Sequence, residues 1–546
     1  MRIPAVRREQ GERLLRSPWW RGGAVLFAGA LPALAFPAPA LWWFAYVALV
    51  PWLLLIRSAG TGRRAALDGW LGGTGYLLAV HNWLLPSLHV FLVILAAFLG
   101  LLWAPWGLLV SRLPGGSPSV ARVGAALIVV PSGWLMIELA RSWDALGGPW
   151  GLLGASQWQV PVALRMASVG GVWLVSLLVV GVNTAVTLLL VTSAARTAAA
   201  VGTVVGALAV GALAVGAIWS WAPQPEPAGA ARIAVVQPGV VEGSNSVELR
   251  FARSEQLTRT LVGRHLDLVV WGESSVGEDL SQRPDLAARI AKLSREVGAD
   301  VLVNMDARQT HTSGRTGIFK SAVLVGPDGP TGERYDKMRL VPFGEYIPAR
   351  SVLGWVTSVG KAAGEDRLRG NRQVVMSVPE PPSPVYSSRS RAGAERLRIG
   401  PLICFESAFP DMSRRLAGDG AQLLIAQSST STFQHSWAPA QHASLGALRA
   451  AESGRPMVHA TLTGISTVYD AQGRRIGTPL GTDTSAAAVF DVPLATGTTL
   501  YVRLGDWPAQ GALGVLAAFC AYEGVRSLRR RTRVESVGAT APAGRL

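Results

Sequence analysis

The chain has 546 residues, of which 49% are hydrophobic and only 16% are charged, and it contains 20 Trp and 61 Gly. Soluble domains usually carry about 25% charged residues, so this composition indicates a large membrane-embedded fraction. It also excludes a disordered chain. The net charge of +16 is accompanied by no basic stripe or base-stacking motif, so we expect no nucleic-acid partner. The two cysteines, Cys404 and Cys520, exclude a disulfide framework and any multi-cysteine metal site.

Hydropathy divides the chain into apolar and polar parts. Eight apolar segments come near the ~20 residues that cross a bilayer, roughly at 22–36, 39–58, 66–85, 90–110, 123–141, 163–191, 198–219 and 507–525. We therefore expect a transmembrane domain at 1–222 with about seven helices, a polar domain at 227–500, a transmembrane helix at 505–527 and a basic tail at 528–546. Ala38-Pro39-Ala40 imitates a secretion-signal cleavage site, but the spans that follow at once argue against that alternative.

Arginine placement predicts the orientation of these spans. The loops and tails that are rich in arginine alternate along the chain; their arginines include Arg2, Arg7, Arg8, Arg13, Arg16, Arg57, Arg63, Arg64, Arg112, Arg122, Arg196, Arg526, Arg529, Arg530, Arg531 and Arg533. Basic loops remain on the cytoplasmic side of a membrane. The sequence therefore predicts a multi-pass protein of the bacterial cytoplasmic membrane, with both termini in the cytoplasm and 227–500 outside.

The polar part alternates between strand and helix patterns. Short buried runs predict strands at 232–237, 266–271, 300–304, 318–325, 397–403 and 421–426, and amphipathic patterns predict helices at 246–263, 283–297 and 439–453. Such alternation is typical of a layered α/β domain. The Pro- and Ser-rich stretch 376–395 predicts a flexible surface insertion.

Three residues that can do chemistry follow buried strands. Glu273 follows Leu-Val-Val-Trp-Gly, Lys337 follows Tyr-Asp, and Cys404 follows Gly-Pro-Leu-Ile. Residues just past such strands tend to face the mouth of an α/β sheet, where sites form. A thiol needs a base in order to attack an acyl carbon, a carboxylate can act as that base, and a lysine can stabilise the charged intermediate. Taken singly, each residue is more often a packing, capping or surface residue; the hypothesis rests on all three together.

The sequences around these residues resemble a known family. Trp-Gly-Glu273-Ser-Ser, Lys337 with Leu-Val-Pro-Phe-Gly-Glu345-Tyr-Ile-Pro, and Ile-Cys404-Phe-Glu406 are similar to the Glu–Lys–Cys triad motifs of the nitrilase superfamily. The long motif after Lys337, between several N-terminal spans and one C-terminal span, resembles the bacterial apolipoprotein N-acyltransferases, the membrane-bound branch. The resemblance covers almost the whole chain.

The resemblance implies a multi-span helical membrane bundle of about eight helices plus an extramembrane α-β-β-α sandwich. It also implies acyl transfer from a phospholipid donor to the N-terminal amine of a diacylglyceryl-cysteine apolipoprotein, without metal or other cofactor. Cys404 would carry the acyl chain as a thioester, Glu273 would act as base, and Lys337 would stabilise the oxyanion. Glu345, Glu406 and Phe405 match supporting positions.

Some positions depart from the family pattern. Phe405 stands where Tyr is common, Phe319-Lys320-Ser321 stands where Tyr-Asn-Ser is frequent, and the segments 427–433 and 460–463 also differ. These departures leave the acyl and headgroup preferences open. Two other interpretations remain: a membrane-tethered nitrilase-type amidase, and a non-catalytic membrane scaffold that binds lipoproteins or an envelope glycosyltransferase.

Overall fold

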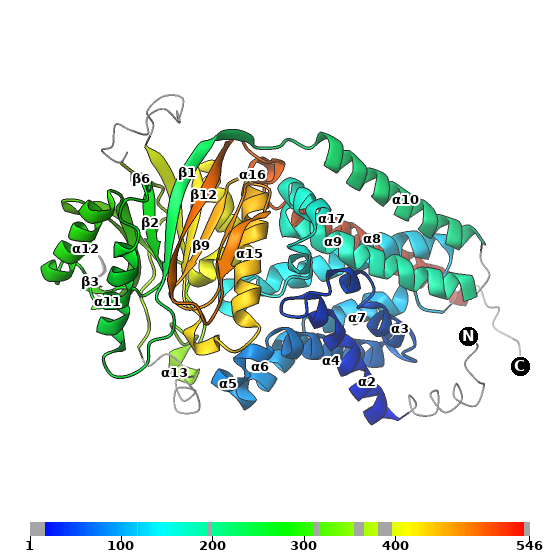
Figure 1. Cartoon of the computed structure of the whole chain (residues 1–546). Helices are drawn as coiled ribbons and strands as arrows, with labels where there is room; N and C mark the ends of the chain where they lie inside the picture. Colours follow the sequence, from blue (N-terminus) through cyan, green and yellow to red (C-terminus); the bar gives the residue numbers. More distant parts are fainter. Residues whose placement is uncertain are drawn as a thin grey trace, which may run out of the picture.

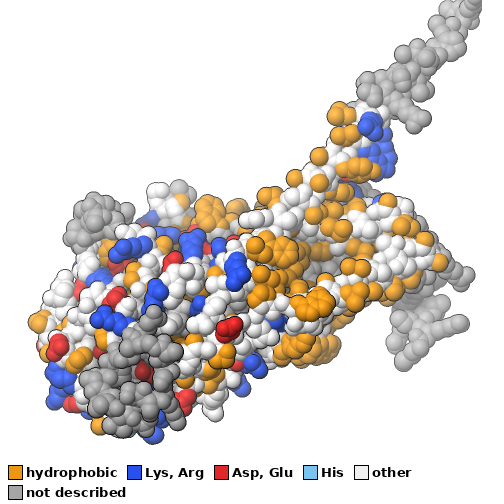
Figure 2. Space-filling model, turned by 90° about the horizontal axis from the view of Figure 1, so that it is seen from above, with side chains coloured by type: hydrophobic (Ala, Val, Ile, Leu, Met, Phe, Trp, Pro, Cys, Tyr) orange, Lys and Arg blue, Asp and Glu red, His pale blue; other side chains and the backbone are white. Residues whose placement is uncertain are grey.

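The computed structural model describes residues 17–116, 118–194, 198–310, 316–353, 365–379 and 396–539. A helical bundle and an α/β sandwich lie side by side, and the chain passes from the bundle into the sandwich and back (Figure 1). Hydrophobic side chains gather over the helical half of the surface, whereas Lys, Arg, Asp and Glu side chains are scattered over the sandwich (Figure 2). The arginines of the N-terminal tail, Arg196 and most of the expected insertion at 376–395 lie outside the described residues.

The bundle is built on long apolar helices and a tryptophan core. Its main helices are α2 (Pro18–Ala30), α3 (Val50–Arg57), α4 (Gly62–Val80), α6 (Val90–Gly100), α7 (Trp103–Arg112), α8 (Val120–Arg141), α9 (Pro161–Ala194), α10 (Ala198–Trp221) and α17 (Trp507–Ala539). Four fully buried tryptophans, Trp52, Trp103, Trp106 and Trp134, pack against one another, and the centroids of Trp52 and Trp106 lie 5.2 Å apart. Such edge-on aromatic contacts fix how the helices cross.

Fewer helices than expected are long and apolar enough to cross a membrane. Among the described residues, α8, α9 and α10 meet that condition, and α6 with α7, bent by 45° between them, would make a fourth span. The segment Trp42–Arg57 is shorter, since a 3-10 turn (Trp42–Tyr46) precedes α3. α4 carries Asp68, which is buried and paired with Arg21 at 2.7 Å and Arg64 at 2.8 Å. The remaining expected spans therefore stay a prediction.

The sandwich consists of two facing six-stranded sheets. The first has the order β12-β1-β2-β3-β4-β5 and the second β11-β10-β9-β8-β7-β6. The bounds are β1 (Glu226–Gln237), β2 (Leu268–Trp271), β3 (Asp300–Thr310), β4 (Thr316–Gly326), β5 (Gly329–Asp336), β6 (Met376–Val378), β7 (Leu397–Ile403), β8 (Leu423–Ser428), β9 (Met457–Thr461), β10 (Ser466–Tyr469), β11 (Arg475–Leu480) and β12 (Ala486–Thr496). β1, β2 and β3 are parallel, as are β7, β8 and β9, with antiparallel strands at the edges.

Helices cover both outer faces of the sheets, so the α-β-β-α sandwich predicted from the sequence is confirmed. α11 (Ser246–Arg259) and α12 (Pro284–Val297) cover the first sheet; α14 (Pro410–Gly418) and α15 (Ala438–Ser453) cover the second (Figure 1). Aliphatic side chains from the two inner faces, such as Ile233, Val270, Ile399 and Ile425, form one buried cluster between the sheets. Every residue of α15 except Ala440 is buried, because α15 lies between the second sheet and α9.

The junction between the two bodies is held by a buried charge. α9 is broken at Gly170 and Gly171, which leaves the N–H of Val172 free of the helix ladder. Glu452 of α15 accepts a hydrogen bond from that N–H at 2.7 Å and is paired with Arg449 at 2.9 Å. A carboxylate at the start of a helix segment is favoured by the helix dipole. The α/β sandwich therefore caps a helix of the bundle.

Candidate active site

Glu273 and Cys404 lie just past the carboxyl ends of β2 and β7, which belong to different sheets, and Lys337 directly follows β5. Gly272 permits the close approach of the two sheets, because a Cβ there would stand 2.0 Å from the N–H nitrogen of Leu462. Cys404 has φ of 52°, in the left-handed region that a non-glycine residue adopts only under strain. The turn (Cys404–Ala408) thus directs the thiol toward the gap between the sheets.

The structure brings these three residues together. The Nζ of Lys337 lies 3.3 Å from Oε1 of Glu273 and donates a hydrogen bond to Oε1 of Glu345 at 2.8 Å. The Cys404 thiol lies beside the carboxylate of Glu273, close enough for each group to shift the pKa of the other. Glu273 is 4% exposed and Lys337 is 1% exposed, so bulk water is largely excluded from the group. A half-buried thiol therefore lies beside a buried carboxylate and a buried ammonium group.

The charges of this group influence one another strongly. Burial would raise the pKa of Glu273, but Lys320 and Lys337 outweigh it and hold that pKa at about 2. Burial, followed by the nearby Glu273 carboxylate, raises the pKa of the Cys404 thiol. Burial alone would lower the pKa of Lys337, and the carboxylates of Glu273 and Glu345 raise it well above its usual value. At neutral pH the resting site holds a protonated thiol beside an ionised carboxylate.

A second lysine, Lys320 of β4, was not predicted as a site residue. Its Nζ lies 3.2 Å from Oε1 of Glu273 and 3.4 Å from Oδ1 of Asp306, and it donates a hydrogen bond to Oγ of Ser274 at 2.7 Å. Glu273 is therefore held between two ammonium groups. The sequence signal that could have found Lys320 is the rarity of lysine, since only four occur in the chain.

The supporting residues have distinct positions. Glu406 accepts four hydrogen bonds, from the hydroxyl of Tyr335 (2.7 Å) and from the N–H groups of Met338 (2.7 Å), Arg339 (3.1 Å) and Ile403 (2.8 Å). It does not contact the reacting groups; it ties the segment after Lys337 to the Cys404 turn. Glu345 contacts Lys337 directly and also accepts the N–H of Val341 at 2.9 Å.

His442 of α15, to which the sequence analysis gave no role, contacts the Cys404 turn. Nε2 of His442 lies 3.1 Å from the carbonyl oxygen of Cys404 and 2.9 Å from Oγ of Ser407. Burial lowers the pKa of His442 to about 4 and that of its ring neighbour His459 to about 3. Both imidazoles are therefore neutral at pH 7, and His442 orients the turn without adding charge.

The loop between α8 and α9 forms the wall of the site on the bundle side. Trp150 is buried and donates a hydrogen bond to Oε1 of Gln441 at 2.8 Å. A Cβ at Gly148 would stand 2.5 Å from Cζ of Phe405, so this glycine lets the loop lie directly against Phe405. Phe433, in one of the segments that depart from the family pattern, packs on Trp83 with centroids 4.8 Å apart. The Cys404 turn is thus enclosed between the two bodies.

Comparison with known proteins agrees with this architecture. Residues 28–185 match the family profile described as the apolipoprotein N-acyltransferase N-terminal domain, and residues 232–500 match the profile of carbon-nitrogen hydrolases. An apolipoprotein N-acyltransferase of Geobacter metallireducens is 28% identical over 90% of this chain and 94% of its own length. One of Azotobacter vinelandii is 29% identical over 98% of this chain and 100% of its own.

Among solved structures, an amidase from Nesterenkonia sp. is similar over 50% of this chain and 93% of its own, at 18% identity and a TM-score of 0.33. The two profiles divide the chain as the structure does, into a helical bundle and a sandwich, and the full-length relatives span both parts. The chain belongs to the apolipoprotein N-acyltransferase family.

Proposed function

We propose that the protein transfers an acyl chain from a phospholipid to the N-terminal amine of the diacylglyceryl-cysteine of an apolipoprotein. The observation that carries this proposal is the buried group formed by the Cys404 thiol, the Glu273 carboxylate and the Lys337 ammonium. That group lies in a sandwich docked against apolar helices. Both substrates are held in the membrane, the donor as a lipid and the acceptor by its lipid anchor. An enclosed site between the sandwich and the bundle suits them.

In the first half-reaction, Sγ of Cys404 attacks the acyl ester carbonyl while Glu273 takes the thiol proton. Lys337 stabilises the oxyanion of the tetrahedral intermediate. As negative charge grows on the substrate oxygen, the ammonium of Lys337 is shared between it and Glu273, and the carboxylate becomes a better base. The intermediate collapses to a thioester; the C–O bond breaks, and the lysophospholipid oxygen takes the proton from Glu273.

In the second half-reaction, the free amine of the apolipoprotein attacks the thioester and gives its proton to Glu273. Collapse breaks the C–S bond, forms the amide and returns the proton to Sγ of Cys404. An ester and an amine become an alcohol and an amide, so the exchange needs no oxidant, metal or nucleotide. Exclusion of water keeps the thioester from being hydrolysed before the amine arrives.

The roles are tested by following acylation of Cys404. Mass spectrometry of protein purified with phospholipid should find an acyl mass on the Cys404 peptide, removable by hydroxylamine. Cys404→Ala should lack this adduct, and the control Cys520→Ala should retain it, since Cys520 is exposed on α17. Acylation at Cys520 alone would contradict the proposal.

Two further variants separate base from oxyanion donor. Glu273→Gln keeps the shape but removes the base, and Lys337→Arg keeps the charge but adds bulk in a tight site. Each should slow Cys404 acylation by about 10²–10⁴-fold. A reduction of less than about threefold, far smaller than that range, would show that the substituted residue does not have the proposed role. Hydrolysis of an amide substrate by the wild type but not by Cys404→Ala, with no acyl transfer from phospholipid, would favour the amidase interpretation.

The membrane topology belongs to the same proposal. We place eight spans in the cytoplasmic membrane, with both termini in the cytoplasm and the sandwich outside, because arginine-rich loops alternate along the sequence. Reporter fusions at residue 300 and at the C-terminus test this arrangement. A cytoplasmic signal from the fusion at residue 300 would overturn it.

A further inference from the structure

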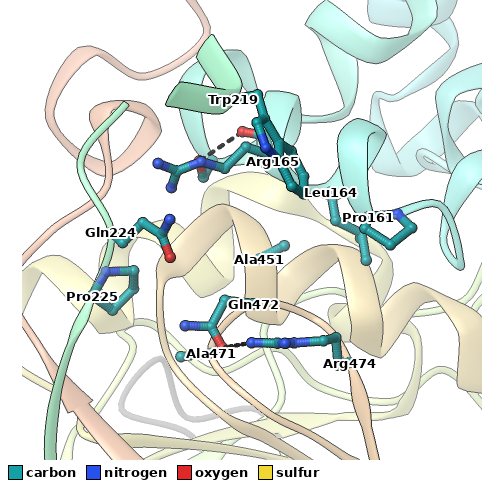
Figure 3. A pocket seen from close by; sticks show the side chains of 11 residues that line it. Pro161, Leu164, Arg165, Trp219, Gln224, Pro225, Ala451, Ala471, Gln472 and Arg474 are labelled. Atoms are coloured by element: carbon teal, nitrogen blue, oxygen red, sulfur yellow. Dashed lines mark hydrogen bonds between the residues drawn. The ribbon is translucent and has the colours of Figure 1, made fainter. Parts of the chain in front are cut away.

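A cavity of about 300 Å³ lies at the junction of the helical bundle and the sandwich (Figure 3). Its walls come from the first turns of α9, the end of α10 with the linker that follows, α15, and the turn between β10 and β11. None of its lining residues belongs to the Cys404 site. Ala451, which lines the cavity, is nine positions beyond His442 on α15, roughly 13 Å along the helix axis.

Two guanidinium groups and no carboxylate line this cavity. Arg165 donates hydrogen bonds to the carbonyl oxygens of Ala222 and Pro223, and its buried Nε has no hydrogen-bond partner among the described residues. No carboxylate among the described residues forms an ion pair with Arg165. Arg474, on the opposite wall in Figure 3, is paired with Asp470 outside the lining at 3.1 Å. The cavity therefore carries one positive charge that nothing in the described chain neutralises.

The cavity also adjoins an exposed apolar surface. α10 meets the length and hydropathy condition for a membrane span, yet only 6% of its apolar window is buried inside the protein. Val210 and Leu213 are 66% and 74% exposed, and Trp219 at the end of the same helix lines the cavity. Tryptophan is enriched where a membrane meets water. α10 is thus an apolar helix that is exposed along its length, and its last turn lines a polar, cationic cavity.

The exposed apolar helix α10 beside a cationic cavity is complementary to a phospholipid with a negatively charged headgroup. Acyl chains match the exposed face of α10, and a phosphate matches an arginine that lacks a counter-ion, because guanidinium forms paired hydrogen bonds with phosphate oxygens. The side-chain amides of Gln224 and Gln472 also line the cavity and provide further donors; Gln224 lies between the two arginines, and Gln472 lies beside Arg474, from which its Oε1 accepts a hydrogen bond at 3.0 Å (Figure 3). We propose that this cavity binds the phosphate of an anionic phospholipid headgroup, with Arg165 as its main ligand, at a site separate from the acyl-transfer centre.

Binding is measured on the full-length Cys404→Ala protein in neutral detergent, by native mass spectrometry during titration with phosphatidylglycerol. This background cannot form the thioester, so the outcome does not depend on the proposed acyl transfer. Arg165→Gln should weaken the first bound lipid by about tenfold or more, as expected for a lost hydrogen bond to a charged group. Arg475→Gln changes a neighbouring exposed arginine outside the lining and should bind like the parent.

Arg474→Gln is the second variant, in case Arg165→Gln fails to fold, and it should weaken binding to a smaller extent because Asp470 already neutralises part of its charge. Equal affinity of the lining variants and Arg475→Gln would overturn the proposal. Displacement of the lipid by millimolar inorganic phosphate would show a free-anion site and overturn the lipid assignment. Equal binding of diacylglycerol, which lacks the phosphate, would overturn the role of the arginines.

Discussion

Replacing Glu406 with Gln should separate a positioning role from a catalytic one. All four partners of the Glu406 carboxylate are donors: the hydroxyl of Tyr335 and three backbone N–H groups, at 2.7 to 3.1 Å. A Gln side chain offers one oxygen and one NH₂ group, so a donor must face a donor in a fully buried place. One unsatisfied buried group costs about 1–3 kcal/mol, and the loss of charge-assisted bonds brings the total to about 2–4 kcal/mol.

For a domain of this size we expect Tm to fall by roughly 5–10 °C. Cys404 acylation should slow as well, because Met338, held by Glu406, adjoins Lys337. The acid limb of the acylation pH profile should keep its midpoint, since Glu273, the proposed base, is unchanged. Tyr335→Phe, which removes one donor of four, is the matched control and should cost about 1 kcal/mol. If Glu406→Gln leaves Tm and rate unaltered, or moves the acid limb, the positioning role is refuted.

Three further outcomes follow from the same contacts. Lys320→Met should raise the pKa of Glu273 and move the acid limb of Cys404 acylation to higher pH; an unmoved limb would show that Lys320 does not act on the base. Glu452→Ala leaves the buried guanidinium of Arg449 without its carboxylate partner and should lower the free energy of unfolding by about 3–5 kcal/mol. A loss no larger than that of the exposed control Glu523→Ala would refute the junction role. His459 is neutral when buried but protonates in the unfolded chain near pH 6.5, so it lowers the free energy of unfolding by about 1.4 kcal/mol per pH unit as pH falls from 6.5 to about 3. His459→Gln should flatten that decline between pH 6.5 and 5, and an equal slope would contradict the assignment.

The positions of Glu273, Lys337 and Cys404 were accessible from sequence for a geometric reason. Each follows a strand. β2 and β7 each belong to the parallel part of their own sheet, and their carboxyl ends meet across the sandwich. Nearly every residue of β2 and β7 is buried, which made these two strands predictable, whereas β5, the strand before Lys337, is mostly exposed or half-buried and not the buried strand that was expected there. β9 to β12 were missed: β9 and β10 are short inner strands, and the edge strands β11 and β12 carry exposed residues that break the pattern.

The contacts that Lys320 and His442 make in the site could not be predicted from the sequence, although the rarity of lysine marks Lys320 as unusual. Lys320 lies within β4, where alternation alone does not tell which charged group a side chain meets. His442 lies in a helix that is buried on every side, so the pattern of residues around it does not show which neighbouring element its side chain contacts. The limits of the spans in the bundle were hard to predict for a related reason. Asp68 and its arginine partners are polar in sequence and neutralise one another only in three dimensions, so hydropathy alone does not set where a span begins.

Helix α15 links the chemistry to the bundle. His442 holds the Cys404 turn, and Glu452, ten positions later on the same helix, caps the break in α9. Ten residues of helix span roughly 15 Å, and a buried helix transmits position rigidly over that distance. The Cys404 turn is therefore held at a fixed distance from the apolar helices through α15. Because a donor and an acceptor that both sit in a membrane arrive at fixed depth, this rigid docking favours encounter with a lipid-anchored amine over attack by water.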